Sequence, residues 1–447
     1  MQRPLIALLI ASAVTFSATA QAADLIQVYQ QALANDPTYA SARNALTAGQ
    51  ERITQGRSGL LPQVGISGTH LKSNGQFIPV HEGIDVVDGE LVSNFRRDTD
   101  NSSKAITLQL TQPLFRWASW QTYQQSKLTQ AQAEAQFAQA QQDVIVRVSQ
   151  AYFDVLTAQD NLASTQAQKS ATTEQLASAK RNFEVGTQTI TDTHEAQAAY
   201  DLVVAQEFAA INALEVARTA LQQVIGTSPA SLATLRAGVT IAPPEPANIE
   251  PWIASAEQQN YNVAVAQLSV EIAKREIERN RAGHMPTVDL IAQSQRNSQT
   301  AYGETKNNAI GITWNVPIFR GFQVTSKVRE MIALEEKSRN DLEATKRSVA
   351  QSARQAYLGV NSGLAQVKAL EAAEVSSQSA LDSNKLGYQV GVRINIDVLN
   401  AQRQLYSTQR DLAKARYDTI MNGLRLKAAA GTLKEADLVP INTLLTN

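Results

Sequence analysis

The sequence predicts a mainly α-helical protein that also contains short membrane β-strands and is built from a duplicated helix–strand–strand–helix unit. Three observations predict this class. Two very long segments, 119–185 and 324–390, contain no proline and few or no glycines. Short segments in which apolar and polar residues alternate precede each of them. Matching residues also recur at a nearly constant spacing along the chain, which indicates a duplication.

The segment 1–22 has the features of a secretory signal peptide. Arg3 is followed by the apolar run 5–16 and by an Ala-x-Ala cleavage site that ends at Ala22. We therefore expect the mature chain to begin at Ala23 and to act beyond the inner membrane. The chain has no cysteine, which excludes disulfides and a lipidated cysteine anchor. Its net charge of −1 gives no reason to expect a nucleic acid as partner.

The duplication is carried by residues that lie 205 positions apart: Tyr152 and Tyr357, Gly186 and Gly391, Asp192 and Asp397, Gly226 and Gly431. Further upstream, Pro113–Arg116 matches Pro317–Arg320 at a step of 204, and Arg57–Pro62 matches Arg281–Pro286 at a step of 224. The change in step indicates an insertion of about 20 residues in a loop of the first copy, within 74–102, because connecting loops tolerate insertions.

We expect the first repeat over 23–226 and the second over 252–431. The first has strands at about 62–72 and 103–113 and long helices at about 119–185 and 190–226. The second has strands at about 286–296 and 308–317 and long helices at about 322–390 and 396–430. The proline-rich segment 227–251 connects the repeats, since proline cannot continue a helix. Residues 432–447 form a C-terminal tail.

The long helices are too long to be stable alone. At 1.5 Å per residue, the segment 119–185 would extend roughly 100 Å. Such helices must bury an apolar stripe against neighbours, as coiled coils do. A simple coiled-coil bundle would account for the helices but not for the strands.

The predicted strands alternate apolar with polar residues, and the apolar set is Ile106, Leu108, Leu110, Ile310, Ile312, Trp314 and Val316. This period of two over about ten residues is typical of barrel strands with a lipid-facing side. A pair of soluble, half-buried hairpins is the alternative. Four strands cannot close a barrel, and an open edge in lipid leaves backbone groups unpaired. Two chains would give eight strands and three would give twelve, and the pattern does not decide between them.

The duplication, the Phe-x-Val-Gly turn at 183–186, the Tyr-x-Val-Gly turn at 388–391 and the opening segment 24–32 together resemble the TolC family. The resemblance implies a homotrimer with a 12-stranded β-barrel in the outer membrane of a Gram-negative bacterium and a long α-helical barrel in the periplasm. The connector and the tail would form an equatorial region. The implied function is an exit duct for efflux of small molecules, for type I secretion of proteins, or for both.

The implied partners are a periplasmic adaptor (membrane fusion) protein, an inner-membrane transporter of the ABC, RND or MFS type, and outer-membrane lipid. The resemblance also implies that the helical tips at Val185, Gly186, Val390 and Gly391 dock the adaptor. These four are first of all turn residues, because glycine adopts positive φ at little cost.

The resemblance further implies a periplasmic constriction formed by Thr191, Asp192, Tyr388, Arg393, Asp397 and Asn400. In it, Tyr388 would bond Asp192, and Arg393 would reach the region of Thr191. Asp397 and Asn400 would line the passage. Asn400 stands where the family has a second aspartate, so the resemblance does not decide whether divalent cations block the passage. The alternative is that Asp192 and Asp397 only cap helices, and that Tyr388 and Arg393 are plain surface residues.

No catalytic pattern is present. The four histidines are scattered without metal-ligand spacing, and no glycine-rich phosphate loop occurs. We expect no catalytic residues, no metal and no cofactor, and we do not expect an enzyme. The alternative function is a periplasmic coiled-coil adaptor or structural protein without pore activity.

Overall fold

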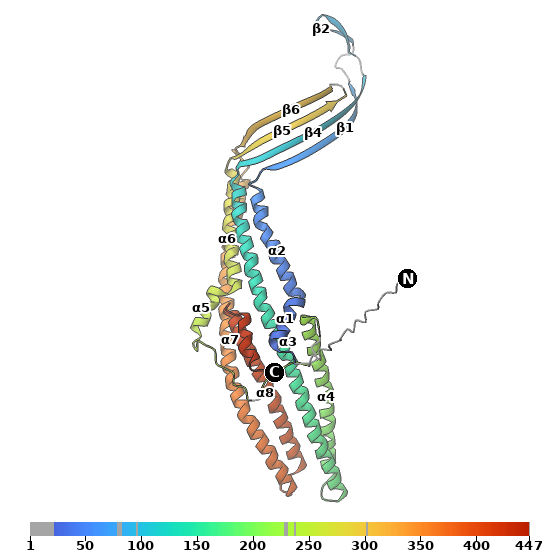
Figure 1. Ribbon diagram of the computed structural model, residues 1–447, viewed down its shortest axis with the longest axis vertical. Coiled ribbons are helices and arrows are strands. Elements are labelled where there is room, and N and C mark those ends of the chain that lie inside the picture. Colours follow the sequence, from blue (N-terminus) through green and yellow to red (C-terminus); the bar gives the residue numbers. More distant parts are fainter. Residues whose placement is uncertain are drawn as a thin grey trace, which may run out of the picture. The chain divides into compact units, whose positions relative to one another are not determined.

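The computed structural model describes residues 22–77, 83–94, 97–227, 231–236, 238–300 and 303–446 (Figure 1). The predicted signal peptide lies outside these ranges except for Ala22. The elements of the first repeat are α1 (Leu25–Asn35), α2 (Pro37–Ser58), β1 (Gln63–Phe77), β2 (Gly83–Val87), β3 (Glu90–Asn94), β4 (Arg97–Phe115), α3 (Trp117–Glu184) and α4 (Ile190–Ile225). Those after it are α5 (Glu250–Gln259), α6 (Tyr261–Arg281), β5 (Thr287–Gln299), β6 (Gly303–Asn315), α7 (Gln323–Gln389), α8 (Asn395–Ala429) and α9 (Leu438–Asn442), with 3₁₀ turns at Ala282–His284 and Glu435–Asp437. The prediction of a mainly α-helical chain with long helices and a few β-strands is confirmed.

The chain forms two compact units, and each takes segments from both repeats. The helical unit comprises the described residues of Met1–Asn44, Gln136–Ala264 and Thr345–Asn447. The sheet unit comprises Ala45–Ala135 and Val265–Ala344. The units do not follow the repeat boundaries because α3 and α7 each belong partly to one unit and partly to the other.

The sheet unit contains a four-stranded antiparallel sheet in the order β1-β4-β5-β6. β1 and β4 are longer than the predicted strands 62–72 and 103–113. Polar residues continue their ladder as far as Phe77, which lies opposite Arg97. β5 likewise extends to Gln299, beyond the predicted end at 296. β6 begins five residues before the predicted 308, at Gly303. It ends at Asn315, so Val316, predicted within it, lies beyond the strand, next to Pro317, which lacks an N–H for the ladder.

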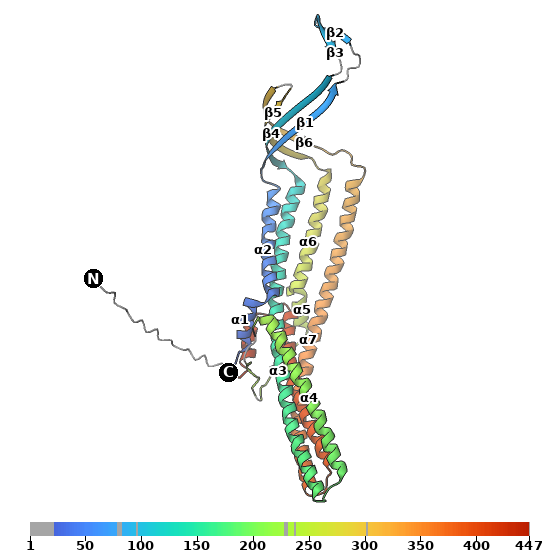
Figure 2. The same cartoon turned by 90° about the vertical axis from the view of Figure 1, so that its right-hand side faces the viewer.

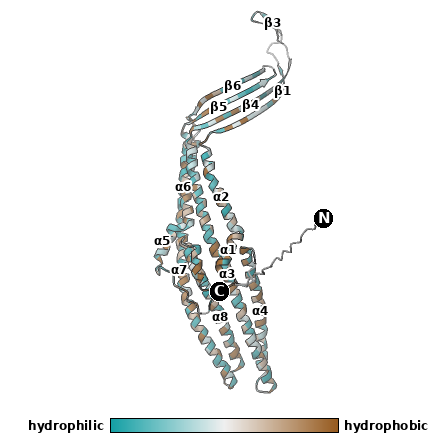
Figure 3. Ribbon diagram, in the orientation of Figure 1, coloured by the Kyte–Doolittle hydropathy of each residue, from teal (hydrophilic) through white to brown (hydrophobic). Residues whose placement is uncertain are grey.

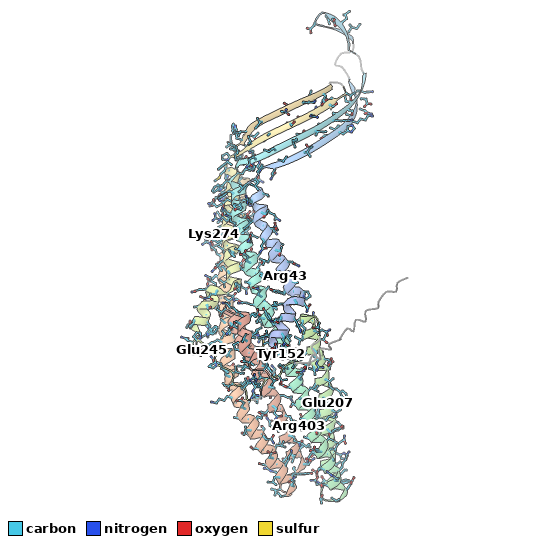
Figure 4. All side chains as sticks on the ribbon, in the orientation of Figure 1. Arg43, Tyr152, Glu207, Glu245, Lys274 and Arg403 are labelled. Atoms are coloured by element: carbon cyan, nitrogen blue, oxygen red, sulfur yellow. The ribbon has the colours of Figure 1, made fainter. Side chains whose placement is uncertain are left out.

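The helical unit is held by an apolar core in which α1, α3, α4, α8 and the C-terminal tail meet. Tyr152, Phe153 and Leu156 on α3 are almost fully buried there. The Tyr152 hydroxyl donates to the Ala233 carbonyl at 2.7 Å, and the Phe153 and Tyr417 rings lie 5.5 Å apart. Figure 3 colours these parts of α1, α3 and α8 as apolar, and Figure 4 labels Tyr152. Burial of such large side chains, about 1.5–3 kcal/mol each, stabilises the unit.

The connector between the repeats packs onto the C-terminal tail. Leu235 forms a β-bridge with Leu445, and Leu232 forms one with Ala23. The prediction that Pro251 belongs to the connector is wrong, because α5 already begins at Glu250. Proline is tolerated in the first turn of a helix, where its missing N–H has no partner in any case.

Close packing explains one of the three glycines of α7. A Cβ on Gly363 would lie 2.4 Å from the Thr419 hydroxyl oxygen on α8. The pair of helices therefore approaches more closely at this point than a larger residue allows. No helix in the described part of the chain has the length and apolarity that crossing a membrane requires.

Candidate functional site

The helical unit ends in two helical turns that have the same backbone form. Gly186 follows α3 with φ of 76°, and Gly391 follows α7 with φ of 77°. Each glycine N–H donates to a carbonyl three residues back, Phe183 and Tyr388 respectively, at 2.9 and 3.2 Å. Left-handed glycine at this position is a common helix end because it satisfies carbonyls that the helix leaves unpaired. The repeat thus builds the same tip twice, and Figure 2 shows the two turns at the same end of the unit.

The valines of these tips are exposed. Val185 on the α3–α4 tip is 72% exposed, and Val390 and Val392 on the α7–α8 tip are 65% and 79% exposed. Exposed apolar side chains that gather at one end of a protein are candidates for an interaction surface. All four tip residues named by the sequence, Gly186 and Gly391 included, therefore lie at the surface of this end.

Asp192 closes a capping box at the start of α4. Its Oδ2 accepts from the Thr189 backbone N–H at 3.1 Å and from the Thr189 hydroxyl at 2.8 Å, while the Thr189 hydroxyl accepts from the Asp192 N–H. The capping role considered as the alternative for Asp192 is therefore present in this protomer. Thr191 is exposed beside it.

Tyr388 joins the two helical hairpins but does not bond Asp192 as expected. Its hydroxyl donates to Gln188 Oε1 at 2.7 Å and accepts from Asn182 Nδ2 at 3.4 Å. Its ring packs against the buried cluster of Leu381, Val398 and Leu405. Within the protomer, the Asp192 carboxylate instead accepts from Thr189.

Arg393 also has a partner other than the expected one. Its Nη1 lies 3.6 Å from Asp397 Oδ2, one helical turn away, and does not pair with the region of Thr191 within the protomer. Both groups are partly exposed, so a pair of this kind contributes little to stability. Asn400 is exposed three residues after Asp397, and the i, i+3 spacing puts the two on the same face of α8.

Asn395 is a buried polar residue at this end that the sequence analysis did not identify. Its side chain is fully buried; Oδ1 accepts from Gln175 Nε2 at 2.6 Å, and Nδ2 donates to the Asp192 carbonyl at 3.0 Å. Asn395 therefore links α8 with both α3 and α4. A signal was available, since Asn395 shares the buried stripe of α8 with Val398 and Leu399.

The sheet unit has one apolar and one polar face, and the strand register determines which residues lie on each. Residues directly opposite each other in an antiparallel ladder share a face. One row crosses all four strands through Val64, Leu110, Ala292 and Ile310. The predicted residues on the same two strands share this face: Ile106 and Leu108 lie four and two residues from Leu110, and Ile312 and Trp314 lie two and four residues from Ile310. A row on the other face is Ser67, Thr107, Gln295 and Asn307.

The apolar face is open in the protomer. Ile66, Ile310 and Trp314 are each at least 73% exposed. The outer edges of β1 and β6 have no strand partner among the described residues. Within the same described ranges, no cluster of three or more His, Asp or Glu side chains could hold a metal ion.

The chain matches known proteins over nearly its whole length. The family model of the outer membrane efflux proteins matches residues 28–227 and 252–432. The chain is 34% identical to outer membrane protein TolC of Vibrio cholerae, covering 96% of this chain and 95% of the relative. It is 32% identical to the proteases secretion protein PrtF of Dickeya chrysanthemi, covering 95% of this chain and 91% of the relative.

Solved structures share the fold. The Campylobacter jejuni CmeC outer membrane channel superimposes with a TM-score of 0.78 at 17% identity, covering 94% of this chain and 89% of that one. Vibrio cholerae VceC gives 0.75 at 18% identity, covering 91% and 96%. The chain belongs to the family of outer membrane efflux proteins, which confirms the predictions of an export function and of a place in the outer membrane.

Proposed function

We propose that three copies of this chain form one exit duct, in which their sheets close a 12-stranded barrel in the outer membrane and their long helices form a tunnel in the periplasm. The sheet carries this proposal. Its one apolar face suits lipid, and its other face is polar. In hydrocarbon, the open edges of β1 and β6 must find partners, since each unpaired backbone group costs several kcal/mol. Pairing β6 of one copy with β1 of the next satisfies them.

Ile106, Leu108, Leu110, Ile310, Ile312 and Trp314 face lipid in this arrangement. Val316, just past β6, is exposed at the same end of the sheet as Trp314. Three copies rather than two leave an open lumen, because an eight-stranded barrel is filled by its own side chains.

The narrow point of the duct lies at the helical tips in this proposal. Thr191, Asp192, Tyr388 and Arg393 would hold the tips closed, and Asp397 and Asn400 would line the passage. The Tyr388 bonds to Gln188 and Asn182 support a role in closure, because they tie the α7–α8 turn to the α3–α4 turn. Within the assembly, Arg393 has a second candidate partner in the Thr191 region of a neighbouring copy.

The tips also serve as the docking surface for a periplasmic adaptor. Val185, Gly186, Val390 and Gly391 present an exposed apolar surface to it. The adaptor would connect the duct to an inner-membrane transporter of the ABC, RND or MFS type, which would supply the energy. Relatives named for protease secretion favour proteins among the cargo, and those named for efflux favour small molecules.

Conductance in a planar lipid bilayer tests the proposal. Purified protein should form pores, and chemical cross-linking should trap trimers. Purified trimers that insert but carry no ion current would refute the duct, and a stable monomer that stays out of lipid would refute the shared barrel.

A further inference from the structure

Two matching arginines of the repeat have different surroundings. Arg116 and Arg320 lie 204 residues apart at equivalent positions of the repeat; Arg116 directly follows β4, and Arg320 lies five residues after the end of β6. Arg116 donates two hydrogen bonds to the Asp289 carboxylate, at 2.8 and 2.7 Å. Arg320 is exposed, and within the described part of the chain no carboxylate pairs with it. The arginine of the first repeat is thus neutralised by an aspartate of the second repeat, and Arg320 has no such partner among the described residues.

The repeat also indicates what faces Arg320 in the closed barrel. Pro113 of β4 lies opposite Asp289 of β5. In the closed barrel, β6 pairs with β1 of the next copy as β4 pairs with β5. Pro317 corresponds to Pro113 at the step of 204 residues, and Gly65 corresponds to Asp289 at the step of 224 residues. Pro317 therefore lies opposite Gly65 of the next copy. The position equivalent to Asp289 is therefore a glycine, which has no carboxylate. Closing the barrel does not supply Arg320 with the partner that Arg116 has.

Arg320 lines a cavity of about 660 Å³ where β5 and β6 join α6 and α7. The other cations of its lining are already paired. Lys327 donates to both carboxylate oxygens of Glu330 at 2.8 and 2.9 Å, and Arg279 pairs with Glu276. Among the described lining residues, Arg320 is thus the cation that remains available to an anion.

The loop around Arg320 also exposes a cluster of large apolar side chains. Ile318 is 95%, Phe319 is 73% and Phe322 is 75% exposed, and the two phenylalanine rings meet edge to face at 5.5 Å. Phe322 has a φ of +63°, in the left-handed region that a bulky residue rarely adopts. Backbone strain of this kind is concentrated at functional sites. An exposed aromatic cluster beside a cation suits the boundary between lipid and water.

We propose that Arg320 and the Ile318–Phe322 loop bind the phosphate of an anionic phospholipid in the leaflet on the side of the helices. The guanidinium forms paired hydrogen bonds to phosphate oxygens, and Ile318, Phe319 and Phe322 contact the acyl chains. This inference rests on the proposed function, because it places the strand ends at the membrane boundary. One such site exists for each copy of the chain.

Native mass spectrometry of the detergent-purified trimer, titrated with phosphatidylglycerol, tests this site. Arg320→Gln should bind the lipid about tenfold more weakly, the loss expected for one charged hydrogen-bond donor. Gly65→Asp should weaken binding similarly, because the new carboxylate neutralises Arg320 as Asp289 neutralises Arg116. Gly65→Asn is the matched uncharged control and should bind as the wild type does. In the protomer, no atom lies within 4 Å of a Cβ on Gly65.

Two outcomes would overturn the proposal. The first is equal phosphatidylglycerol affinity in the wild type and Arg320→Gln, and the second is displacement of the lipid by an equal concentration of inorganic phosphate, which would indicate a free-anion site. Bilayer conductance of the same preparations separates this result from the proposed function. Trimers that conduct but bind the lipid equally well in all variants would leave the duct intact and remove the lipid site.

Discussion

The side chain of Asn395 donates a hydrogen bond to the main-chain carbonyl of Asp192 at 3.0 Å, which joins the start of α8 to the start of α4. The same side chain accepts from Gln175 on α3 at 2.6 Å and is fully buried. A buried polar group that loses its partners costs about 1–3 kcal/mol. Asn395 is therefore positioned to hold the two helical hairpins together near their tips.

Asn395→Ala is expected to loosen the tips. It leaves the Gln175 amide and the Asp192 carbonyl without this partner, so ion conductance in planar bilayers should rise. Gln378→Ala on α7 is the control, because among the described residues the Gln378 side chain bonds only Asp382 of its own helix. If the two variants conduct alike, Asn395 does not restrain the passage.

The combination Tyr388→Phe with Arg393→Ser should also raise conductance. The first change removes the hydroxyl that bonds Gln188 and Asn182, and the second removes the cation that pairs with Asp397. Tyr200→Phe, which deletes a hydroxyl from α4, is the control and should conduct like the wild type. Unchanged current in the double variant would show that these residues do not keep the tips closed.

Inhibition by divalent cations tests the residues assigned to the constriction. Asp397→Ala should weaken inhibition by divalent cations added on the periplasmic side of a bilayer. Asn400→Asp should strengthen it, because it puts a second carboxylate on the face of α8 that carries Asp397. Dose–response curves of the current measure both effects. Identical curves for the three proteins would place these side chains away from the ion path.

Asp160 makes stability depend on pH. Burial raises the pKa of its carboxyl above the ordinary 3.8, against the lowering effect of its bond from Tyr417. Such a group binds its proton more tightly in the folded state, so its contribution to stability is greatest below about pH 4 and is lost as pH rises through the raised pKa.

Asp160→Asn should therefore raise the melting temperature at neutral pH, since the amide oxygen still accepts from the Tyr417 hydroxyl, 2.7 Å away in the wild type, without a buried charge. The gain should shrink toward pH 4, where the wild-type carboxyl is protonated. Asp154→Asn, at an exposed position of the same helix, should show neither effect. A gain that is the same at both pH values would refute this account.

The periodicity of apolar residues and the internal repeat predicted much of this fold, because backbone geometry fixes which side chains of a strand or helix share a face. Alternation places Leu108 and Leu110 on one face of any strand, and the register then brings Val64 and Ile310 beside them. The ends of the strands were less predictable, because polar residues can continue a ladder as well as apolar ones.

Side-chain partners at the tips were not predictable in the same way. Whether Tyr388 reaches Gln188 or Asp192 depends on the relative position of two hairpins, which no local pattern encodes. Capping by Asp192 was the alternative that the sequence analysis gave, and Thr189, three residues earlier, completes the capping box. Asn395 could have been noticed as a polar residue within an apolar stripe.

The ladder between β1 and β4 continues past Ser103, where β5 ends, to the pair Phe77 and Arg97. In the proposed orientation, this longer hairpin projects furthest from the cell into the extracellular medium. The turn at Asp88 and Gly89, with φ of 53° and 86°, joins β2 to β3 in the insertion that this hairpin carries. A reporter peptide inserted at this turn should be accessible to antibodies on intact bacteria.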